Sequence, residues 1–376
     1  MKRIYLDNNA TTQIDPLVID AMIEELAAPP RNPSSIHHFG QEGKKVLSNC
    51  RSQIASFLGL KASEVFFTSG GTEGMNLLIR GALDDSKAHI IGSPIDHSCV
   101  YSTLIDLQAK GADVTFLPAD TYGAPHPDDL QKALRSNTKL IVLTASNSET
   151  GVKIDLEKMA AIAQSAKVPL IIDGVSLIGK EPFTIPSGVS GVAFSAHKFH
   201  GPKGVGFIFA HSSFQLSPLV TGGNQEKKIR SGTENLPGIV GMTRALTLID
   251  EDKNAASLIS LRELFESEIF SAIPDVEING EGPRVSNTSN LFFPGVDGES
   301  LLIALDMHKI AASHASACAS GALEPSRVLI KMGYSRERAS SSLRFSFSRF
   351  NTRDEIKQAA KVIISLTGKI RAAVLS

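Results

Sequence analysis

Between residues 60 and 210, short apolar runs alternate with stretches whose apolar residues recur every three or four positions. The runs predict β-strands, and the spacing of the other stretches predicts amphipathic helices. Strands that alternate with helices form a mostly parallel sheet with helices on both faces. The predicted strands are EVFFTSG, AHIIGSP, ADVTFLPA, KLIVLTA, VPLIID and GVAFSA, and the predicted helices are PLVIDAMIEELA, GKKVLSNCRSQIASFLG, EGMNLLIRGAL, DDLQKALRS and LEKMAAIAQSAK.

The pattern changes in the last third of the chain. One long helical stretch is predicted over residues 238–272, followed by the strand-like SNLFFPG and the helical ESLLIALDMH and RDEIKQAAKVIISLTGKI. The chain has 376 residues, more than a single domain usually holds. We therefore expect a large domain at residues 13–250 and a smaller α+β domain built from residues 1–12 and 251–376.

Composition narrows the classes of function. Apolar residues make up 42% of the chain, charged residues 20%, and the net charge is −1, so no bulk charge favours nucleic acid or an anionic membrane. No apolar run approaches the roughly 18 residues that span a bilayer, and the first residues lack a signal-peptide core, so we expect a cytoplasmic protein. The three cysteines form no CxxC pair, which predicts neither a disulfide framework nor a zinc knuckle, and hence no metal site.

Three loops carry candidate chemistry. In FFTSGGTEGMN, the segment Ser69–Thr72 separates a strand from a helix, where glycines and free N–H groups suit a phosphate. In VPLIID, Asp173 ends a strand and can pair with a protonated ring nitrogen. In FSAHKFHGPKGVG, Lys198 can form a Schiff base with an aldehyde. Taken singly, each segment has an ordinary alternative: a helix cap with a glycine turn for Ser69–Thr72, a helix N-cap for Asp173, and a surface hairpin for the Lys198 loop. Together, the three segments suit pyridoxal 5′-phosphate.

With these residues in view, the chain resembles the NifS/IscS-type cysteine desulfurases, which are fold-type I pyridoxal-phosphate enzymes of the class-V aminotransferase family. The resemblance runs from end to end through YLDNNATT, NPSSIHHFG, FTSGGTEGMN, DH of IDHS, SAHKFHGPKGVG, RSGTEN, SACASGALEPSRVL and LRFSFSRF. It implies a large domain with a mostly parallel seven-stranded sheet, a smaller α+β domain and a homodimer. It also implies L-cysteine as substrate, a persulfide intermediate, and a sulfur-acceptor protein such as an iron–sulfur scaffold.

The resemblance also assigns roles to individual residues. Lys198 would be the Schiff-base lysine, and His97 would stack on the cofactor ring and move protons. Arg344 would hold the substrate carboxylate, with help from the segment of Asn32. Cys318 would be the nucleophile. The phosphate would be held by Gly71, Thr72, Ser195 and His197, with Thr233 arriving from the partner subunit.

Two of these assignments have support in the residues themselves. Cys318 lies among small residues in AASHASACASGALEP, which suits a mobile loop better than a core. Arg344 lies in the strand-like SSLRFSFSRF, and its guanidinium matches a carboxylate in a bidentate manner; a surface arginine is the alternative. Cys50 and Cys99 are predicted to be packing residues, and Lys203 a turn or surface residue.

Two positions depart from the family pattern. Ser148 and Ser176 replace the asparagine and glutamine that contact the ring hydroxyl of the cofactor in relatives. Water can fill the space, or Asn147 can shift across. Three alternatives follow: a selenocysteine lyase, a class-V aminotransferase, or a weakly active scaffold that only binds cofactor.

Overall fold

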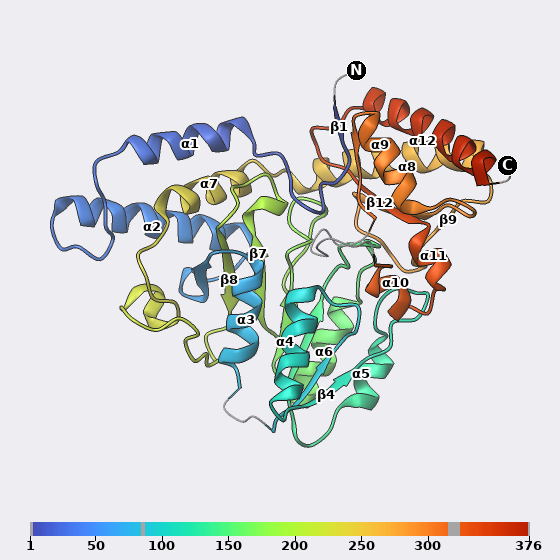
Figure 1. Cartoon of the computed structure of the whole chain (residues 1–376). Helices are drawn as coiled ribbons and strands as arrows, with labels where there is room; N and C mark the ends of the chain where they lie inside the picture. Colours follow the sequence, from blue (N-terminus) through green and yellow to red (C-terminus); the bar gives the residue numbers. More distant parts are fainter. Residues whose placement is uncertain (1–2, 84–86, 315–323, 375–376) are drawn as a thin grey trace.

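The computed structural model describes residues 3–83, 87–314 and 324–374, which fold into two groups of elements (Figure 1). The first group surrounds a large central sheet. The second lies beside it and contains the helices nearest the C-terminus, together with the N-terminal strand β1 (Ile4–Tyr5).

The central sheet has seven strands in the order β2-β8-β7-β6-β5-β3-β4. Strand β8 runs antiparallel to both of its neighbours, and the remaining neighbouring pairs are parallel. This arrangement confirms the predicted mostly parallel seven-stranded sheet. The strands are β2 (Val65–Thr68), β3 (His89–Gly92), β4 (Asp113–Phe116), β5 (Thr138–Thr144), β6 (Leu170–Asp173), β7 (Val189–Ser195) and β8 (Gly206–Ala210).

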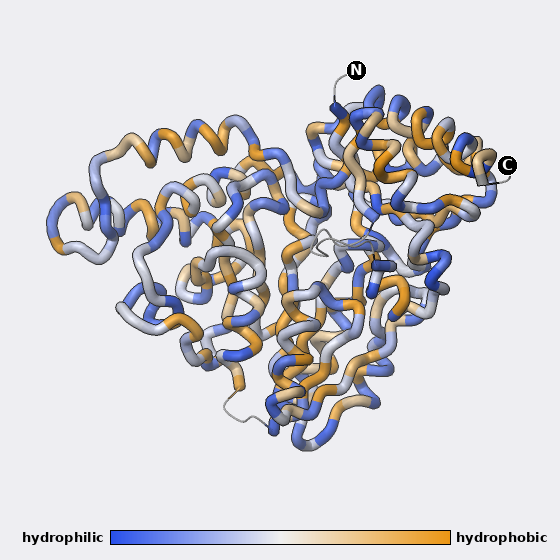
Figure 2. The backbone as a smooth tube through the Cα atoms, viewed as in Figure 1, coloured by the Kyte–Doolittle hydropathy of each residue, from blue (hydrophilic) through white to orange (hydrophobic). Residues whose placement is uncertain are grey.

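Helices cover both faces of this sheet because alternate strand residues are buried on opposite sides. On one face, apolar residues of the strands pack with α3 (Gly71–Gly81) and α4 (Ser98–Ala109). On the other face they pack with α1 (Pro16–Ala27), α2 (His38–Phe57), α6 (Leu156–Ala166) and α7 (Leu236–Thr247). The helices show bands of hydrophobic and hydrophilic residues in Figure 2, as surface helices require. A further helix, α5 (Pro127–Ala133), packs against α6.

The second group has its own hydrophobic core. Helices α8 (Glu251–Ala272), α9 (Gly298–Met307) and α12 (Arg353–Val374) cover a three-stranded antiparallel sheet. Ile4 and Leu6 join this core, since β1 pairs in parallel with β11 (Ile310–Ala311). The sheet contains β9 (Glu277–Ile278), β10 (Thr288–Phe292) and β12 (Ser342–Ser346), and two short helices, α10 (Arg327–Lys331) and α11 (Arg336–Ser340), connect the group to the central sheet. The exact domain boundaries at residues 12/13 and 250/251 stay a prediction.

The predicted helices differ from the structure in two places. Helix α4 was not predicted, because its β-branched residues and weak apolar spacing hide the helical period. The single long helix expected over 238–272 is broken between Thr247 and Glu251, where Asp250 caps α8 by accepting a hydrogen bond from the Lys253 amide. No helix in the described ranges is long and apolar enough to cross a membrane.

Candidate active site

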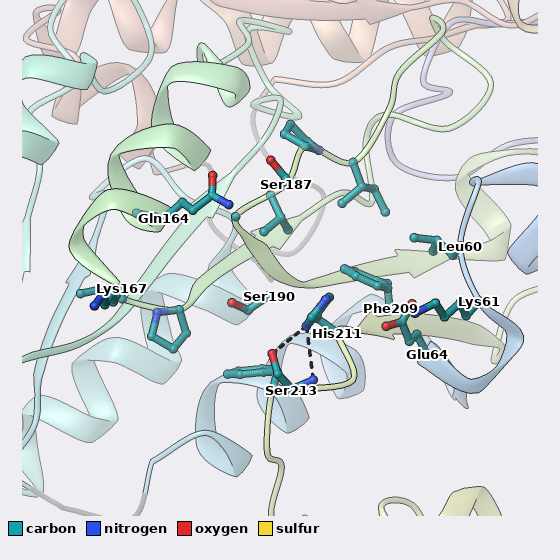
Figure 3. A pocket seen from close by; sticks show the side chains of 18 of the residues that line it. Leu60, Lys61, Glu64, Gln164, Lys167, Ser187, Ser190, Phe209, His211 and Ser213 are labelled. Atoms are coloured by element: carbon teal, nitrogen blue, oxygen red, sulfur yellow. Dashed lines mark hydrogen bonds between the residues drawn. The ribbon is translucent and has the colours of Figure 1, made fainter.

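The carboxyl ends of the parallel strands surround a cavity of about 560 Å³, which we call the carboxyl-end cavity. Strands β3, β5, β6 and β7 each deliver polar residues to it at the point where the strand stops. Ligand sites of open α/β sheets lie at this edge. A second cavity of about 590 Å³, the amino-end cavity, lies where β6 and β7 begin (Figure 3). The predicted site residues that line the carboxyl-end cavity are Gly71, Thr72, His97, Ser148, Asp173, Ser176, Ser195, His197 and Lys198.

The turn from β2 into α3 forms an open cup of backbone. Gly70 has φ 152°, a conformation that L side chains rarely adopt. A Cβ on Gly71 would lie 2.5 Å from Val175 Cγ2, so only glycine lets the backbone stand this close to the loop that follows β6. The first amide groups of the 11-residue helix α3 therefore point into the cavity, where an anion is stabilised by the helix dipole.

One neighbour of the cup was not predicted from the sequence. Glu73 accepts a hydrogen bond from the Ser69 amide at 2.9 Å and forms an ion pair with Arg230 at 2.8 Å. Burial tends to raise the pKa of this carboxyl, but the hydrogen bonds from Arg230 and Ser69 outweigh burial and lower its pKa. The Ser69 amide is thus already occupied, the Gly70 amide donates to Thr68 Oγ1 at 3.4 Å, and the donors left for a ligand are the amides of Gly71 and Thr72.

Lys198 follows the last residue of β7 in a short 3-10 turn (Ala196–Lys198). Its Nζ donates to the backbone oxygens of Asn9 at 2.5 Å and Ala10 at 3.0 Å. The N-terminal segment YLDNNATT thereby holds the lysine at the cavity wall. An aldehyde ligand that displaces these carbonyl contacts would meet an amine on a rigid element.

His97 lies at the N-terminus of α4, held by the end of two strands. The preceding Asp96 is buried and accepts the amides of Ser93 at 2.8 Å and Thr144 at 2.9 Å. Burial, with the nearby Asp173, raises the pKa of Asp96 to about 7. Asp96 therefore ties the segment after β3 to the end of β5 immediately before His97 in the chain, a positioning role that the motif alone does not reveal.

Cys99 packs against the core beneath α3 and α4, as predicted, and it also lines the carboxyl-end cavity, which was not predicted. It lines the cavity with its Sγ 3.0 Å from His97 Nδ1. Burial raises the pKa of this thiol. Cys50, a residue of α2, is buried in the hydrophobic core, as predicted.

The only group of possible metal ligands found among the described residues is His97, Cys99 and Asp173, whose ligand atoms lie within 4.8 Å of one another. Two of the three are residues predicted to contact the cofactor ring. The convergence of these donors therefore needs no metal to explain it.

The two serines that replace family residues face the same cavity as Asp173. Asp173 is buried and accepts the Val175 amide at 3.0 Å. Asn147 does not line this cavity. Its side chain donates to Ile95 O and accepts the amides of Glu149 and Thr150, which fixes the loop. The suggested shift of Asn147 across the gap is therefore wrong, because every polar atom of its amide group is engaged elsewhere.

Lysine charges contribute to the electrostatics of the cavity. Burial above all, with the charges of Lys198, Lys203 and Lys180 added to it, lowers the pKa of His197 to about 4. Lys203 is exposed, as predicted, and also lies at the cavity rim. A dianionic ligand would be stabilised by this field.

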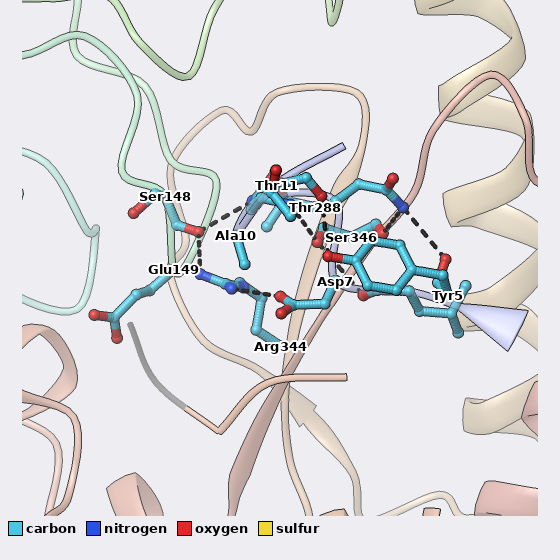
Figure 4. Close-up of polar contacts among 12 residues, drawn as sticks. Tyr5, Asp7, Ala10, Thr11, Ser148, Glu149, Thr288, Arg344 and Ser346 are labelled. Carbon is cyan, nitrogen blue, oxygen red and sulfur yellow. Dashed lines mark hydrogen bonds and ion pairs between the residues drawn. The ribbon is translucent and has the colours of Figure 1, made fainter. Parts of the chain in front are cut away.

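Arg344 lies on β12, just behind the cavity wall (Figure 4). It is 2% exposed, forms an ion pair with Asp7 at 2.7 Å, and donates to the Ser148 backbone oxygen at 3.0 Å. Its Nε has no hydrogen-bond partner among the described residues. The alternative of a surface arginine is therefore wrong, although Arg344 reaches the cavity only through Ser148.

Two further predicted residues do not line the cavity, and a third is not described. Asn32 is exposed, and its side chain accepts the Ser34 amide at 3.0 Å. Thr233 is exposed in the loop before α7. Cys318 lies outside the described residues.

Comparisons with known proteins agree with this geometry. A sequence model of the aminotransferase class-V family matches residues 4–359. The chain belongs to this family.

A cysteine desulfurase IscS of Dictyoglomus turgidum is 39% identical over 99% of this chain and 96% of its own. A cysteine desulfurase of a Nostoc species is 38% identical over 99% and 94%. A solved NifS-like protein aligns with a TM-score of 0.89 at 32% identity, covering 98% of this chain and all of its own. The resemblance to NifS/IscS proteins is thus confirmed.

Proposed function

We propose that the protein is a cysteine desulfurase that uses pyridoxal 5′-phosphate, removes sulfur from L-cysteine and releases L-alanine. One observation carries the proposal: Lys198, Asp173, His97 and the Gly70–Thr72 cup line a single cavity at the carboxyl ends of the strands. The similarity to relatives named cysteine desulfurase, over nearly the whole chain, supports the choice of cysteine as substrate.

The residues present fit the cofactor. The cavity volume of about 560 Å³ suits a ligand of this size. The glycine cup and its helix N-terminus suit a phosphate, and the cations that depress the pKa of His197 suit its two negative charges. Asp173, Lys198 and His97 would meet the ring nitrogen, the aldehyde carbon and the ring face. Ser195, His197 and Thr72 would complete the phosphate contacts.

When bound, the cofactor supplies an electron sink that stabilises negative charge at the Cα of an amino acid. Lys198 would hold it through the amine and, once released by the substrate, would take the Cα proton on Nζ. The carbonyl oxygens of Asn9 and Ala10 keep that amine at the cavity wall. His97 directly follows the buried Asp96, which anchors this part of the loop. His97 would pass a proton to or from the substrate thiol.

Arg344 would bind the substrate carboxylate. Its guanidinium already holds Asp7 and the Ser148 oxygen, so its plane is set before substrate arrives. An ion pair this buried is costly to break, which keeps the fork in one orientation. The substrate carboxylate would accept hydrogen bonds from the guanidinium N–H groups that these two contacts leave available. The arginine would therefore keep its orientation when substrate binds.

Cys318 would carry the sulfur. Its thiolate attacks the substrate Sγ, a sulfur–sulfur bond forms, and the Sγ–Cβ bond breaks with the electron pair leaving on carbon. Protonation of that carbon yields alanine, and Cys318 remains as a persulfide. A sulfur-acceptor protein, such as an iron–sulfur scaffold, would then remove the outer sulfur. The homodimer, Thr233 of the second subunit in the phosphate site, Asn32 beside the substrate and a cytoplasmic location remain part of the same proposal.

Turnover of the purified protein with pyridoxal 5′-phosphate, L-cysteine and a dithiol tests the function. Sulfide and alanine should appear in equal amounts. Cys318→Ser should keep the cofactor absorption band and lose sulfide release, while Cys50→Ala, a core cysteine, should keep both. Cofactor binding without any alanine from the wild-type protein would instead support the scaffold alternative, which the space beside Ser148 and Ser176 motivates.

A further inference from the structure

One side chain of the carboxyl-end cavity has no part in the proposed reaction. His97 and Asp173 would both meet the cofactor ring, but the Cys99 thiol that stands with them is left without a role. Cys99 lines the same cavity, with its Sγ 3.0 Å from His97 Nδ1. A thiol, an imidazole and a carboxylate that meet at one point are the donors that Zn²⁺ takes in proteins.

The three side chains are close enough to share one ion. Their ligand atoms all lie within 4.8 Å of one another. Tetrahedral zinc, with bonds of about 2.3 Å to sulfur and about 2.1 Å to nitrogen or oxygen, holds its ligand atoms roughly 3.5 Å apart. Side-chain rotations that move each ligand atom by about 1 Å or less therefore give the required geometry.

Two of the three ligands are already in a form that binds metal. His97 Nδ1 accepts the Cys99 amide at 3.2 Å, which requires an unprotonated ring nitrogen, as metal ligation does. Asp173 accepts the Val175 amide with Oδ1, and no residue in the described ranges donates to Oδ2. An ion at Nδ1 would replace the bond from the Cys99 amide, and the thiol proton would pass to solvent as the sulfur binds.

The charges that act on the thiol favour a cation. Burial first, and then the negative charges of Asp173 and Asp96, raise the pKa of Cys99. The ion therefore has to displace a firmly held proton. The same two carboxylates attract the ion, however, and offset part of that cost.

The cavity supplies access and a fourth ligand. Its volume of about 560 Å³ leaves room for water beside the three side chains. Zinc sites with three protein ligands keep a water molecule in the fourth position. Cysteine spacing did not predict this site, because the carboxylate comes from the end of β6 whereas the thiol and the imidazole come from the start of α4.

We propose that the cofactor-free protein binds one Zn²⁺ ion through His97, Cys99 and Asp173, in competition with pyridoxal 5′-phosphate. Metal binding uses only side chains of the chain itself and does not depend on the desulfurase reaction. The competition rests on the proposed function, which places the cofactor ring against His97 and Asp173. The two ligands would exclude each other, because the ion holds the imidazole and the carboxylate that the cofactor needs.

Cobalt tests the thiol ligand directly. Titration of cofactor-free protein with Co²⁺, without added thiol, should give a near-ultraviolet sulfur-to-cobalt absorption band that saturates at one equivalent, and Zn²⁺ should remove it. Cys99→Ala should lose the band and, against a chromophoric chelator, bind Zn²⁺ at least about tenfold more weakly, since even an outer-shell partner is worth that much. Cys99→Ser keeps the size of the side chain and should show the same loss, which covers an alanine variant that does not fold.

The other two cysteines provide matched controls. Cys50→Ala removes a thiol that is buried in the core, and Cys318→Ser removes the proposed nucleophile. Both variants should keep the cobalt band. A band that survives in both Cys99 variants overturns the proposal, and so does a band that is absent from the wild type or lost in Cys318→Ser.

Cofactor loading tests the competition. One equivalent of Zn²⁺ should slow the appearance of the visible cofactor band at least about tenfold in the wild type, because only the metal-free fraction can bind. A chelator should restore the rate, and zinc should change the loading rate of Cys99→Ala by less than about twofold. Equal loading rates of metal-bound and metal-free wild type overturn the competition. Failure of the proposed function looks different, because the cobalt band would still depend on Cys99 while the metal-free, cofactor-loaded protein would turn over no cysteine.

Discussion

Two cavities of similar volume lie at opposite ends of the same strands, yet they differ in chemistry. The carboxyl-end cavity gathers Lys198, Asp173 and His97 around a glycine cup. The amino-end cavity also holds charged residues, but its polar groups serve the local loops (Figure 3). There Glu64 accepts the Ser212 amide, and His211 bonds to Ser213. Volume alone therefore does not identify a site.

The direction of the helices explains the difference. Helices α3 and α4 begin at the carboxyl-end cavity and turn their free amide groups toward it. Helix α6 ends at the amino-end cavity, with Lys167 as its C-cap. In a parallel sheet every crossover repeats this polarity, so one edge collects helix N-termini and the other collects C-termini. An anionic cofactor belongs at the first edge.

The largest expected effect on activity comes from replacing the lysine of the carboxyl-end cavity, compared with replacing a lysine of the amino-end cavity. Lys198→Ala should abolish the lysine-linked absorption band of the cofactor and lower the rate of sulfide release by at least about 10³-fold, because the covalent attachment and the base are both lost. Lys167→Ala, at the amino-end cavity, should change neither. Spectra and sulfide assays of both variants provide the measurement. Persistence of the band in Lys198→Ala would rule out this lysine.

The next effect compares two arginine–aspartate pairs. Arg344→Gln should lower kcat/KM for cysteine by roughly 10²-fold, chiefly through KM, since it removes the guanidinium that would bind the carboxylate and leaves the half-buried Asp7 without this ion pair. Arg135→Gln breaks a surface pair with Asp113 near the amino ends of the strands and should cost less than about 1 kcal/mol of stability and no activity. Steady-state kinetics that find equal losses in both variants would contradict the assignment.

Much of this arrangement was predictable because parallel strands are buried on both faces. Their continuous apolar runs mark each strand, and the polar residue after each run, such as Asp173 or Ser195, lies at the ligand edge. Lys198 and His97 were found by the same rule and by family motifs.

The remaining features depend on contacts between distant segments, which a single sequence does not report. The ion pair of Asp7 with Arg344 joins residues 337 positions apart. Lys180 has the sequence context of an ordinary turn lysine, and only the fold shows that it is buried and that its Nζ has no hydrogen-bond partner within residues 3–83, 87–314 and 324–374. Cys99 was predicted to be a packing residue, and it does pack against the core, but its contact with His97 inside the cavity could not be inferred because α4 was not predicted.

A pH experiment compares a buried histidine near Lys198 with an exposed one at the amino-end cavity. Burial, with the charge of Arg349, lowers the pKa of His200 to about 4, against 6.5 in the unfolded chain, despite an opposing hydrogen bond to Gln13 O. Between pH 6.5 and about pH 4, the histidine therefore binds a proton in the unfolded state but not in the folded state. The stabilising contribution is therefore complete above about pH 6.5 and is lost as pH falls toward 4.

The expected loss for this one group is on the order of 3 kcal/mol. His200→Asn should flatten the fall in stability over that range, and asparagine tolerates the left-handed backbone at this position, where φ is 67°. His211→Asn, in the exposed loop after β8, should leave the slope as in wild type. Urea unfolding at several pH values measures both, and equal slopes in the wild type and His200→Asn would contradict the pKa assignment.

The smallest expected effect concerns the space beside the cofactor ring. Because Asn147 is held by Ile95 O and two loop amides, its side chain does not fill the volume beside Ser148 and Ser176, and solvent can occupy it. Ser148→Asn combined with Ser176→Gln should therefore shift the pH midpoint of the cofactor band by less than about one unit, in the acid direction, since donors to the ring oxygen favour its anion. Ser187→Asn combined with Ser190→Gln makes the same change of side chains at the amino-end cavity and should shift nothing. Equal midpoints in all three proteins would show that water already supplies the missing hydrogen bonds, and that the difference between the two ends of the sheet lies in the charged residues alone.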